Sequence, residues 1–536
     1  MPSDCLSFTE TSFLSPLLKD YVTQKKELQP FYNRYPEIES FQAQIAEKSN
    51  SYSRSSRAIL VDEIRRQYTG LQKTEAVEEQ LQKLLECNAF TVTTGHQLNL
   101  GTGPLYFLYK ISAAINMSQK LNERYPDQHF VPVYWMATED HDFEEINFFH
   151  LGGQKIQWNR PFGGAVGRMD LSGMEEVLIG LKHLLGPGKH NTALLQIIEE
   201  AYTDSPNLAS ATRHLVHTLF GEYGLVVLDA DSAALKTLFV PAMRQELEQQ
   251  SSYEAVTATN EALKQVHSEY KIQVNPRECN LFYLTDQKRE RLVQDNGGFA
   301  LADGSQYFKK DALLQELEEH PERFSPNVML RPLYQEVILP NLCYIGGGGE
   351  LAYWLQLRAS FESFHVPFPM LQLRSTVLIW SAKQAANWEK LGLSRADLFK
   401  KREELVNFFV RRESALPLDF SDQKNLLVEQ FKALHLLADQ TDASFRGAVA
   451  AQERKQIKGL EHLEKRMLKA QKKKHKDQIE RLTELHESLF PNGSLQERFD
   501  NITSHYHTSS GQLIDRLVKR VNPLECQVLL LTLDAD

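Results

Sequence analysis

Residues 89–104 read AFTVTTGHQLNLGTGP, so a β-branched and aromatic run passes directly into a loop rich in turn-forming residues. Residues 89–94 predict a short buried strand, because the run has the composition of a strand and glycine follows it. Helical periodicity continues through 105–125, and the apolar run 130–138 predicts a second strand. Strand, loop, helix and strand in this order form a βαβ unit, in which the two strands lie parallel.

The same order of elements recurs further along the chain. A helix leads into the buried-strand run GLVVLD, which ends at Asp229. The segment 342–373 predicts in turn a strand, a tight loop of glycines, a helix and another strand. Together these units predict an α/β fold built on a doubly wound parallel sheet. Short strands between 280 and 308 predict a small β insertion beside that sheet.

Helical patterns dominate the rest of the chain. Residues 1–88 predict a polar helical lead-in to a catalytic core at 89–380. Within a helical domain at 381–515, apolar residues recur three and four apart between 424 and 490, which predicts a helical hairpin or coiled coil. The final run CQVLLLTL predicts that 516–536 return to the core and add a last strand to its sheet. The coiled coil is then an excursion from the core.

The composition is that of a folded soluble protein, with 42% hydrophobic and 24% charged residues. The net charge of −10 disfavours nucleic acid and anionic membranes as partners, and the lysine run at 469–476 is typical of a solvated helix face. The five cysteines form no metal or disulfide pattern, and the sequence has neither a signal peptide nor a membrane-spanning apolar run. We therefore expect a cytoplasmic protein that binds neither nucleic acid nor membrane.

The loop at 93–104 is the first candidate site. Loops at the carboxyl ends of parallel strands line the ligand crevice of such sheets, and glycines let backbone N–H groups approach a phosphate or carboxylate. The loop lacks the Gly-Lys-Ser/Thr ending of a Walker loop. An ordinary turn-rich loop is the alternative, but the crowding of polar groups favours an anion or nucleotide site. The candidate residues are Thr94, Gly95, His96, Gln97, Asn99, Thr102 and Gly103.

The second candidate site is TEDHDFEEIN, residues 138–147, at the end of the next predicted strand. Crowded ionisable side chains shift one another's pKa values toward acid–base work, and His141 between Asp140 and Asp142 could transfer a proton. An acid-rich helix N-cap would by itself explain Asp140, Asp142 and Glu144, but it does not explain the histidine, which favours the functional interpretation. One histidine with several carboxylates selects no particular metal, and we expect no tightly bound metal.

The third candidate site combines an arginine with the second glycine loop. Four glycines at 346–349 allow close approach of a ligand, and arginine can pair bidentately with a carboxylate or phosphate. A strand-end arginine further on could serve as a clamp or lie at the surface. The candidates are Arg331, Gly347, Gly348, Glu350 and Arg374.

Three residues flank the coiled-coil region, namely Trp388, Arg498 and Tyr506. They could form a second nucleotide pocket, with an aromatic ring stacked on a base. Residues of this kind more often anchor a helical hairpin, and both interpretations stay open. The sequence contains no G-x-S-x-G nucleophile elbow.

The segments TGHQLNLGTGPLYFLYK, PVYWMATEDHDFEEIN and LRPLYQEVILPNLCYIGGGGELAYW, with the terminal coiled-coil region, resemble the bacillithiol biosynthesis cysteine-adding family, described as cysteine ligases. The match keeps the same order over nearly the full chain. The resemblance implies a Rossmann-like core with connecting segments, a coiled coil that mediates homodimerisation, and addition of cysteine to glucosaminyl-malate. The bond formed is an amide between the cysteine carboxyl and the glucosamine amine.

An amide bond of this kind needs an activated carboxyl, and ATP with Mg²⁺ is the expected activator. The resemblance implies that the first loop binds the activated carboxyl or the phosphates. Asp140, His141 and Asp142 are expected to assist the leaving group or deprotonate the amine, and Arg331 with 346–350 to hold the malate or cysteine carboxylate. A nucleotidyltransferase or hydrolase on the same core and a non-catalytic coiled-coil scaffold are the alternatives.

Overall fold

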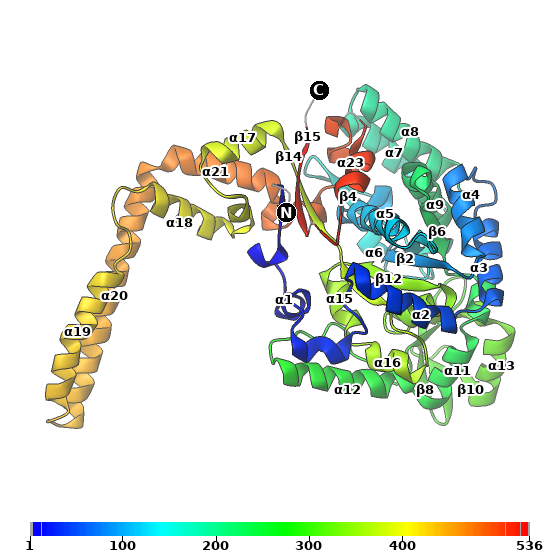
Figure 1. Cartoon of the computed structure of the whole chain (residues 1–536), viewed down its shortest axis with the longest axis horizontal. Coiled ribbons are helices and arrows are strands. Elements are labelled where there is room, and N and C mark those ends of the chain that lie inside the picture. The colour runs from blue at the N-terminus through cyan, green and yellow to red at the C-terminus, as the bar shows by residue number, and fades with distance from the viewer. Residues whose placement is uncertain (1–3, 12, 510, 526, 534–536) are drawn as a thin grey trace. The chain divides into compact units, whose positions relative to one another are not determined.

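Five parallel strands form the central sheet of the chain, of which the computed structural model describes residues 4–11, 13–509, 511–525 and 527–533 (Figure 1). The strands lie in the order β13 (Met370–Leu373), β12 (Asn341–Gly346), β2 (Ala89–His96), β3 (His129–Met136) and β6 (Val226–Asp229). Every neighbouring pair is parallel. The chain starts the sheet at β2 and adds β3 and β6 on one side of it. It then adds β12 and β13 on the other side, so the strand order reverses between β2 and β12. This is a Rossmann-like strand order, as expected from the sequence.

The βαβ unit predicted from the glycine loop is confirmed. Helix α5 (Tyr106–Arg124) connects β2 to β3 and packs on both strands, and α23 (Leu513–Arg520) packs on α5 in turn. From Phe107 to Ser118 every side chain of α5 is buried, because the helix is covered by the sheet and by other helices. The chain thus carries the loop after β2 on a rigid support.

The lead-in of residues 1–88 is helical and belongs to the same compact unit as the sheet. Helix α4 contacts β2, β3 and β6, and α2 contacts β12, so the lead-in forms part of the core. The helices of this region are α1 (Pro16–Val22), α2 (Phe41–Ser51), α3 (Arg54–Gln67) and α4 (Glu75–Leu84).

A second, antiparallel sheet confirms the predicted β insertion. Its order is β10 (Tyr307–Lys309), β9 (Gly298–Leu301), β8 (Arg289–Asp295), β7 (Leu281–Leu284) and β11 (Phe324–Pro326). A two-stranded hairpin also lies between β3 and β6, formed by β4 (Phe148–Leu151) and β5 (Gln154–Gln157).

Helices fill the connections between these strands. The single helix expected between β12 and β13 is instead two short ones, α15 (Gly348–Trp354) and α16 (Arg358–Ser363). The remaining helices are α6 (Phe143–Ile146), α7 (Met174–Leu185), α8 (Lys189–Thr203), α9 (Leu208–Phe220), α10 (Ala233–Thr237), α11 (Val240–Gln249), α12 (Ser251–Val266), α13 (Lys310–Glu319), α14 (Arg331–Ile338) and α22 (Gln496–Phe499).

The last strand returns to the first unit but does not join the parallel sheet, so that part of the prediction is wrong. Strand β15 (Val528–Leu533) lies between β1 (Cys5–Leu6) and β14 (Thr376–Ser381) in a separate three-stranded sheet. An apolar run such as VLLLTL requires cover on both faces, but it does not specify which strands it pairs with.

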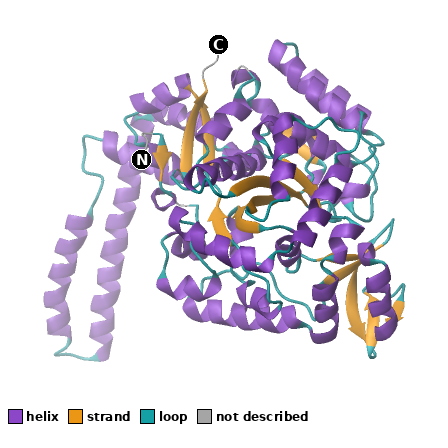
Figure 2. Cartoon of the chain, turned by 45° about the vertical axis from the view of Figure 1, so that its right-hand side comes forward, coloured by secondary structure: helices purple, strands orange, loops and turns teal. Residues whose placement is uncertain are grey.

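The chain divides into two compact units, Met1–Ile379 with Gln496–Asp536, and Trp380–Leu495. The helical unit therefore ends before the predicted limit of residue 515. It contains α17 (Ala382–Lys390), α18 (Arg402–Glu413), α19 (Ser421–Ala438), α20 (Ala443–Lys474) and α21 (Lys476–Leu489) (Figure 1). Helices α19 and α20 lie side by side (Figure 2) and form a coiled-coil hairpin around Phe431, Ala438 and Val449. No helix among the described residues is both long and apolar enough to cross a membrane.

Candidate active site

A cavity of about 450 Å³ lies where the strand order reverses. Ligands of such sheets bind outside the carboxyl ends of the strands at this point. The wall comes from the ends of β2, β3 and β12, from α14 and α15, and from segments distant in sequence. It is lined by Gly95, His96, Gln97, Tyr106, Trp135, Ala137, Gln273, Val274, Val328, Arg331, Pro332, Gln335, Tyr344, Gly347, Gly348, Gly349, Glu350, Tyr353, Trp354, Arg374 and Arg498.

A buried lysine connects the two glycine loops behind this wall. Lys110 on α5 is 1% exposed, and its Nζ lies 2.8 Å from both carboxylate oxygens of Glu350 and also donates to the Gly95 carbonyl. Tyr344 Oη donates to Glu350 Oε1 at 2.6 Å, and the Gly347 N–H donates to Oε2 at 2.7 Å. Burial lowers the pKa of Lys110, whereas Glu350 acts to raise it. The ion pair therefore holds the ends of β2 and β12 together.

Arg374 forms a buried, bidentate ion pair with Glu497. Its two terminal nitrogens lie 2.9 Å and 2.6 Å from the two carboxylate oxygens, and both side chains are at least nine-tenths buried. Its guanidinium also lies over the ring of Tyr106, 5.2 Å from the centroid. The residue predicted as a clamp or a surface residue is thus part of the cavity wall, and it ties the end of β13 to the returning C-terminal segment.

His96 lines the cavity at the end of β2. Its ring lies 5.2 Å from that of Tyr106 and 5.1 Å from that of Phe107. Burial first, and then the charges of Lys110 and Arg374, lower the pKa of His96 well below its ordinary value. His96 is therefore neutral at physiological pH.

Asp140 is held ionised by arginine. Its carboxylate lies 3.1 Å from Arg331 and accepts a hydrogen bond from Gln97 Nε2 at 3.3 Å. Burial alone would raise the pKa of Asp140, but Arg331, Arg289 and the Gln97 bond lower it to about 2. The structure thus joins candidates from all three predicted sites, since Gln97, Asp140 and Arg331 are in contact.

His141 lies beside this group but is exposed and does not line the cavity. Arg289 of the antiparallel sheet donates to His141 Nδ1 at 3.1 Å. Because arginine is always a donor, Nδ1 must accept and the ring proton must lie on Nε2. Burial and Arg289 lower the pKa of His141. Asp142 is the N-cap of α6, as the alternative interpretation of the acidic run had it.

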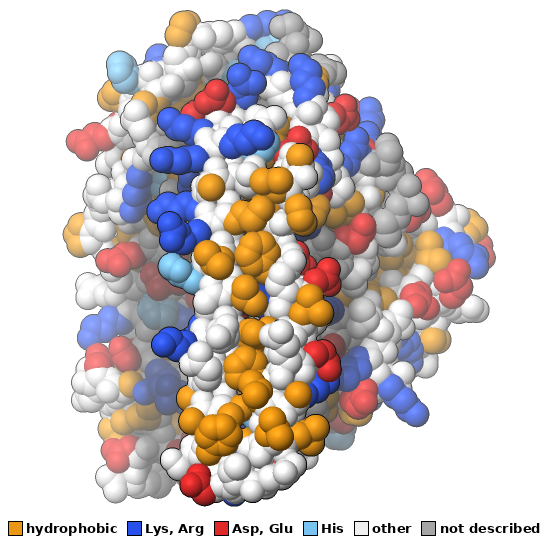
Figure 3. All heavy atoms as spheres, turned by 90° about the vertical axis from the view of Figure 1, so that its left-hand side faces the viewer, with side chains coloured by type: hydrophobic (Ala, Val, Ile, Leu, Met, Phe, Trp, Pro, Cys, Tyr) orange, Lys and Arg blue, Asp and Glu red, His pale blue; other side chains and the backbone are white. Residues whose placement is uncertain are grey.

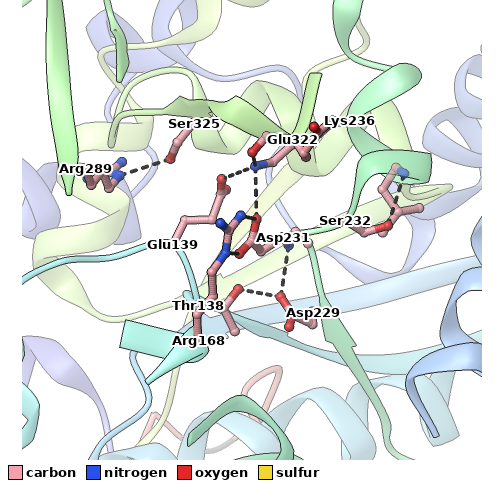
Figure 4. A network of polar contacts seen from close by, with 12 residues as sticks. Thr138, Glu139, Arg168, Asp229, Asp231, Ser232, Lys236, Arg289, Glu322 and Ser325 are labelled. Carbon is pink, nitrogen blue, oxygen red and sulfur yellow. Dashed lines mark hydrogen bonds and ion pairs between the residues drawn. The ribbon is translucent and has the colours of Figure 1, made fainter. Parts of the chain in front are cut away.

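A buried network of charges adjoins Asp140 at the ends of β3 and β6 (Figure 4). Lys236 lies 2.6 Å from Glu139 and 3.1 Å from Asp231, and Arg168 holds Asp231 from the other side at 2.6 Å and 2.8 Å. Asp229 accepts from Thr138, the residue before Glu139. This network positions the strand ends that carry Thr138 to Asp140.

The second half of the first glycine loop has a different role. Asn501 Nδ2 donates to the carbonyls of Gly101 and Gly103, so the returning C-terminal segment packs on this loop. Thr94, Asn99, Thr102 and Gly103 do not line the cavity. Thr94 instead donates to the Ile345 carbonyl and joins β2 to β12.

The three residues predicted to flank the coiled coil belong to two different units. Trp388 is fully buried in the helical unit, with its indole N–H bonded to the Ser394 carbonyl, so no ring face is free to stack on a base. Arg498 and Tyr506 belong to the first unit, where Arg498 lines the cavity. No group of three potential metal ligands occurs among the described residues.

The sequence analysis missed three residues that organise this site, namely Lys110, Arg289 and Glu497. Lys110 carried a signal, since a charge within the apolar helix YFLYKISAAIN needs a buried partner. The other two lie in polar segments without a distinctive pattern. Only the fold brings them to the cavity.

Comparison with known proteins gives a consistent result. The family model "Bacillithiol biosynthesis BshC, N-terminal Rossmann-like domain" matches residues 1–375, and "Bacillithiol biosynthesis BshC, C-terminal coiled-coil domain" matches residues 377–533. A protein of Flavobacterium johnsoniae is 48% identical, with 99% of this chain and 100% of that protein covered. One of Christiangramia forsetii is 50% identical, with 99% of each covered, and one of Bacillus mycoides is 26% identical, with 95% and 96% covered. All three are named "Putative cysteine ligase BshC".

Proposed function

The chain belongs to the bacillithiol biosynthesis BshC family, and we propose that it adds cysteine to glucosaminyl-malate at the cavity between β2 and β12. The reaction would form an amide between the cysteine carboxyl and the glucosamine amine. The names of the relatives support a cysteine ligase. A carboxylate does not acylate an amine without activation, so we propose that ATP with Mg²⁺ activates the cysteine carboxylate. A carboxylate oxygen attacks a phosphorus of ATP and releases ADP or pyrophosphate, and the glucosamine amine then displaces phosphate or AMP from the acyl carbon.

The observation that carries the proposal is the chemistry of the cavity wall. The wall presents three arginines for the anionic groups of malate and of an activated carboxyl. Aromatic rings offer apolar faces to a sugar or an adenine ring. The rings with partly exposed faces are those of Tyr106 and Tyr353, whereas Trp135, Tyr344 and Trp354 line the wall but are buried.

The geometry distinguishes the roles of the candidate residues. Gly95, Gln97 and the loop 347–350 face the cavity, so we assign them to the activated carboxyl and the phosphates. Arg331 is held by Asp140 and can orient an anion beside them. His141 does not line the cavity, so we assign it no contact with the leaving group. It binds Arg289, which lies 4.0 Å from Asp140, and we propose that it helps to position the Asp140 carboxylate that holds Arg331.

Mass spectrometry of the reaction products tests the proposal. Purified protein is incubated with ATP, Mg²⁺, cysteine and glucosaminyl-malate, beside the variants His141→Ala and His183→Ala. His183 lies exposed on α7 and serves as the control. We expect the cysteine adduct from the wild type and from the control variant, and a reduced rate from His141→Ala. ATP consumption without an adduct, from folded protein, would instead favour a hydrolase.

We also propose that the coiled-coil hairpin mediates a homodimer. A band of hydrophobic side chains runs along the hairpin surface (Figure 3). Leu426, Leu436 and Leu463 are 68%, 68% and 52% exposed. Large apolar side chains that gather on an exposed surface typically mark a site of protein–protein contact. A shallow groove between the helices includes Leu426 and Leu463. Analytical ultracentrifugation should find a dimer for the wild type and a monomer for Leu426→Glu with Leu463→Glu.

A further inference from the structure

Three polar groups of the cavity wall have free hydrogen-bonding capacity. Arg374 Nε and His96 Nε2 are buried atoms without a partner in the described part of the chain. The guanidinium of Arg498 forms no ion pair or hydrogen bond with any described residue, although it lines the same cavity. A buried donor without an acceptor is costly, so the Arg374 Nε–H needs an acceptor from a ligand or from water in the cavity.

These groups lie around one aromatic ring. The guanidinium of Arg374 and the ring of His96 each lie 5.2 Å from the ring centre of Tyr106. Arg498 follows Glu497, the ion-pair partner of Arg374, on the same short helix. We call His96, Tyr106, Arg374 and Arg498 the Tyr106 cluster.

The other charged groups of the wall have already found partners. Arg331 is paired with Asp140 at 3.1 Å. The two oxygens of Glu350 accept from Lys110, Tyr344 and Gly347, which fills their hydrogen-bonding capacity. The free capacity of Arg374 and Arg498 is that of N–H donors, and a ligand that fits them must bring acceptor oxygens.

We propose that the Tyr106 cluster binds a carboxylate of the malyl group of the acceptor substrate, with Arg374 Nε–H and Arg498 as donors. His96 is a third donor in the tautomer that carries the ring proton on Nε2. This inference rests on the proposed function and assigns the carboxylate to residues other than Arg331. A carboxylate carries one negative charge, and its two oxygens can accept hydrogen bonds from the Arg374 Nε–H and from the guanidinium of Arg498. A triphosphate carries more charge and arrives with Mg²⁺, whereas the Tyr106 cluster contains no carboxylate that could bind this metal.

Arg498 is the residue to change, because it is exposed and its removal breaks no described ion pair. In Arg498→Gln we expect the KM for glucosaminyl-malate to rise about tenfold, which is the loss of one charge-assisted hydrogen bond, with kcat within about twofold. The KM values for ATP and cysteine should not change. Methyl glucosaminide, which lacks the malyl group, should be used equally by the wild type and by Arg498→Gln.

Binding of free malate tests the cluster without catalysis. Calorimetry should detect malate binding to the wild type and to the control Arg516→Gln, which removes a positive charge from α23, and about tenfold weaker binding to Arg498→Gln. Arg374→Lys keeps a cation beside Glu497 but lacks the Nε–H, so it should also weaken malate binding. Circular dichroism melting would show that each variant is folded.

The outcomes separate the two proposals. A rise in the KM for ATP with no change for the acceptor would overturn the inference, because the anion would then be a phosphate. Equal malate binding by the wild type and Arg498→Gln, or none by the wild type, would overturn it as well. If the wild type binds malate through Arg498 but forms no adduct with any acceptor, the proposed function fails and the carboxylate site stands.

Discussion

Lys110 Nζ lies 2.8 Å from each carboxylate oxygen of Glu350, and this pair joins the ends of the two strands between which the sheet order reverses. Lys110 is almost wholly buried, whereas Glu350 faces the cavity. The pair therefore belongs both to the core and to the site.

Removal of the lysine should be costly because it leaves a carboxylate without its cation. We expect Lys110→Met to lower the free energy of unfolding by about 3 kcal/mol. The double variant Lys110→Met with Glu350→Gln should be less destabilised than Lys110→Met alone, since no charge is then left unpaired. Urea unfolding of the two single variants and the double variant measures this coupling. Additive losses would mean that the two residues act independently.

The buried ion pair between Arg374 and Glu497 should contribute more to the free energy of unfolding than an ion pair at the surface does. Glu497→Gln removes one partner of a buried bidentate pair, and we expect a loss of about 3 kcal/mol or more. The exposed pair of Lys120 and Glu525 is the matched control, and Lys120→Met should cost less than about 1 kcal/mol. Thermal and urea unfolding compare them. Equal losses of stability in the two variants would mean that burial does not determine how much each ion pair contributes.

Asp140 should make stability depend on acid pH. Its pKa is about 2 in the folded chain, below the ordinary value of 3.8. As the pH falls, the unfolded chain therefore takes up this proton at a higher pH than the folded chain does. The stabilisation of the fold by ionised Asp140 is complete above about pH 4 and is lost as the pH falls toward 2. It amounts to about 2 kcal/mol. Asp140→Asn should show a flatter loss of stability over this range in urea unfolding at several pH values.

Asp229 should change the pH dependence of stability in the opposite direction to Asp140. Burial, and then the neighbouring charge of Asp231, raise the pKa of Asp229 to about 6. The folded chain then binds the proton more tightly than the unfolded chain, so stability falls as the pH rises from about 4 to 6. Asp229→Asn keeps an acceptor for Thr138 and removes this charge. We expect it to be at least as stable as the wild type at pH 8, and a less stable variant would contradict the assignment.

The pKa of His141 should respond to Arg289. Burial and the guanidinium of Arg289 both lower this pKa, so Arg289→Met should raise it. NMR titration of selectively labelled histidines measures the change directly, and His183 provides an internal reference. An unchanged His141 signal would show that Arg289 does not hold the ring.

The sequence predicted the parts of this structure that depend on local pattern. The strand before Gly95 and the loop before Glu350 were found because apolar runs end in glycine-rich turns, and the parallel sheet then brought both loops to one cavity. Gln97, Asp140 and Arg331 came from three separate candidate sites and are now in contact.

The rest depends on contacts between distant segments. Glu497 lies 123 residues from Arg374, and no local pattern marks either as the partner of the other. The final strand was recognised as a strand, but its apolar pattern could not tell one sheet from another. Trp388 looked available for stacking because a sequence does not show which aromatic side chains are closed off.

The return of the chain after Leu495 has a consequence for its synthesis. A ribosome makes the strands of the parallel sheet and then the whole helical unit before it reaches Glu497, Arg498 and Asn501. Until that moment Arg374 lacks its carboxylate, and the loop around Gly101 and Gly103 lacks the side chain that packs on it. The nascent protein therefore carries all the strands of the parallel sheet with an unfinished pocket, and the pocket is completed only by residues that are translated after the helical unit.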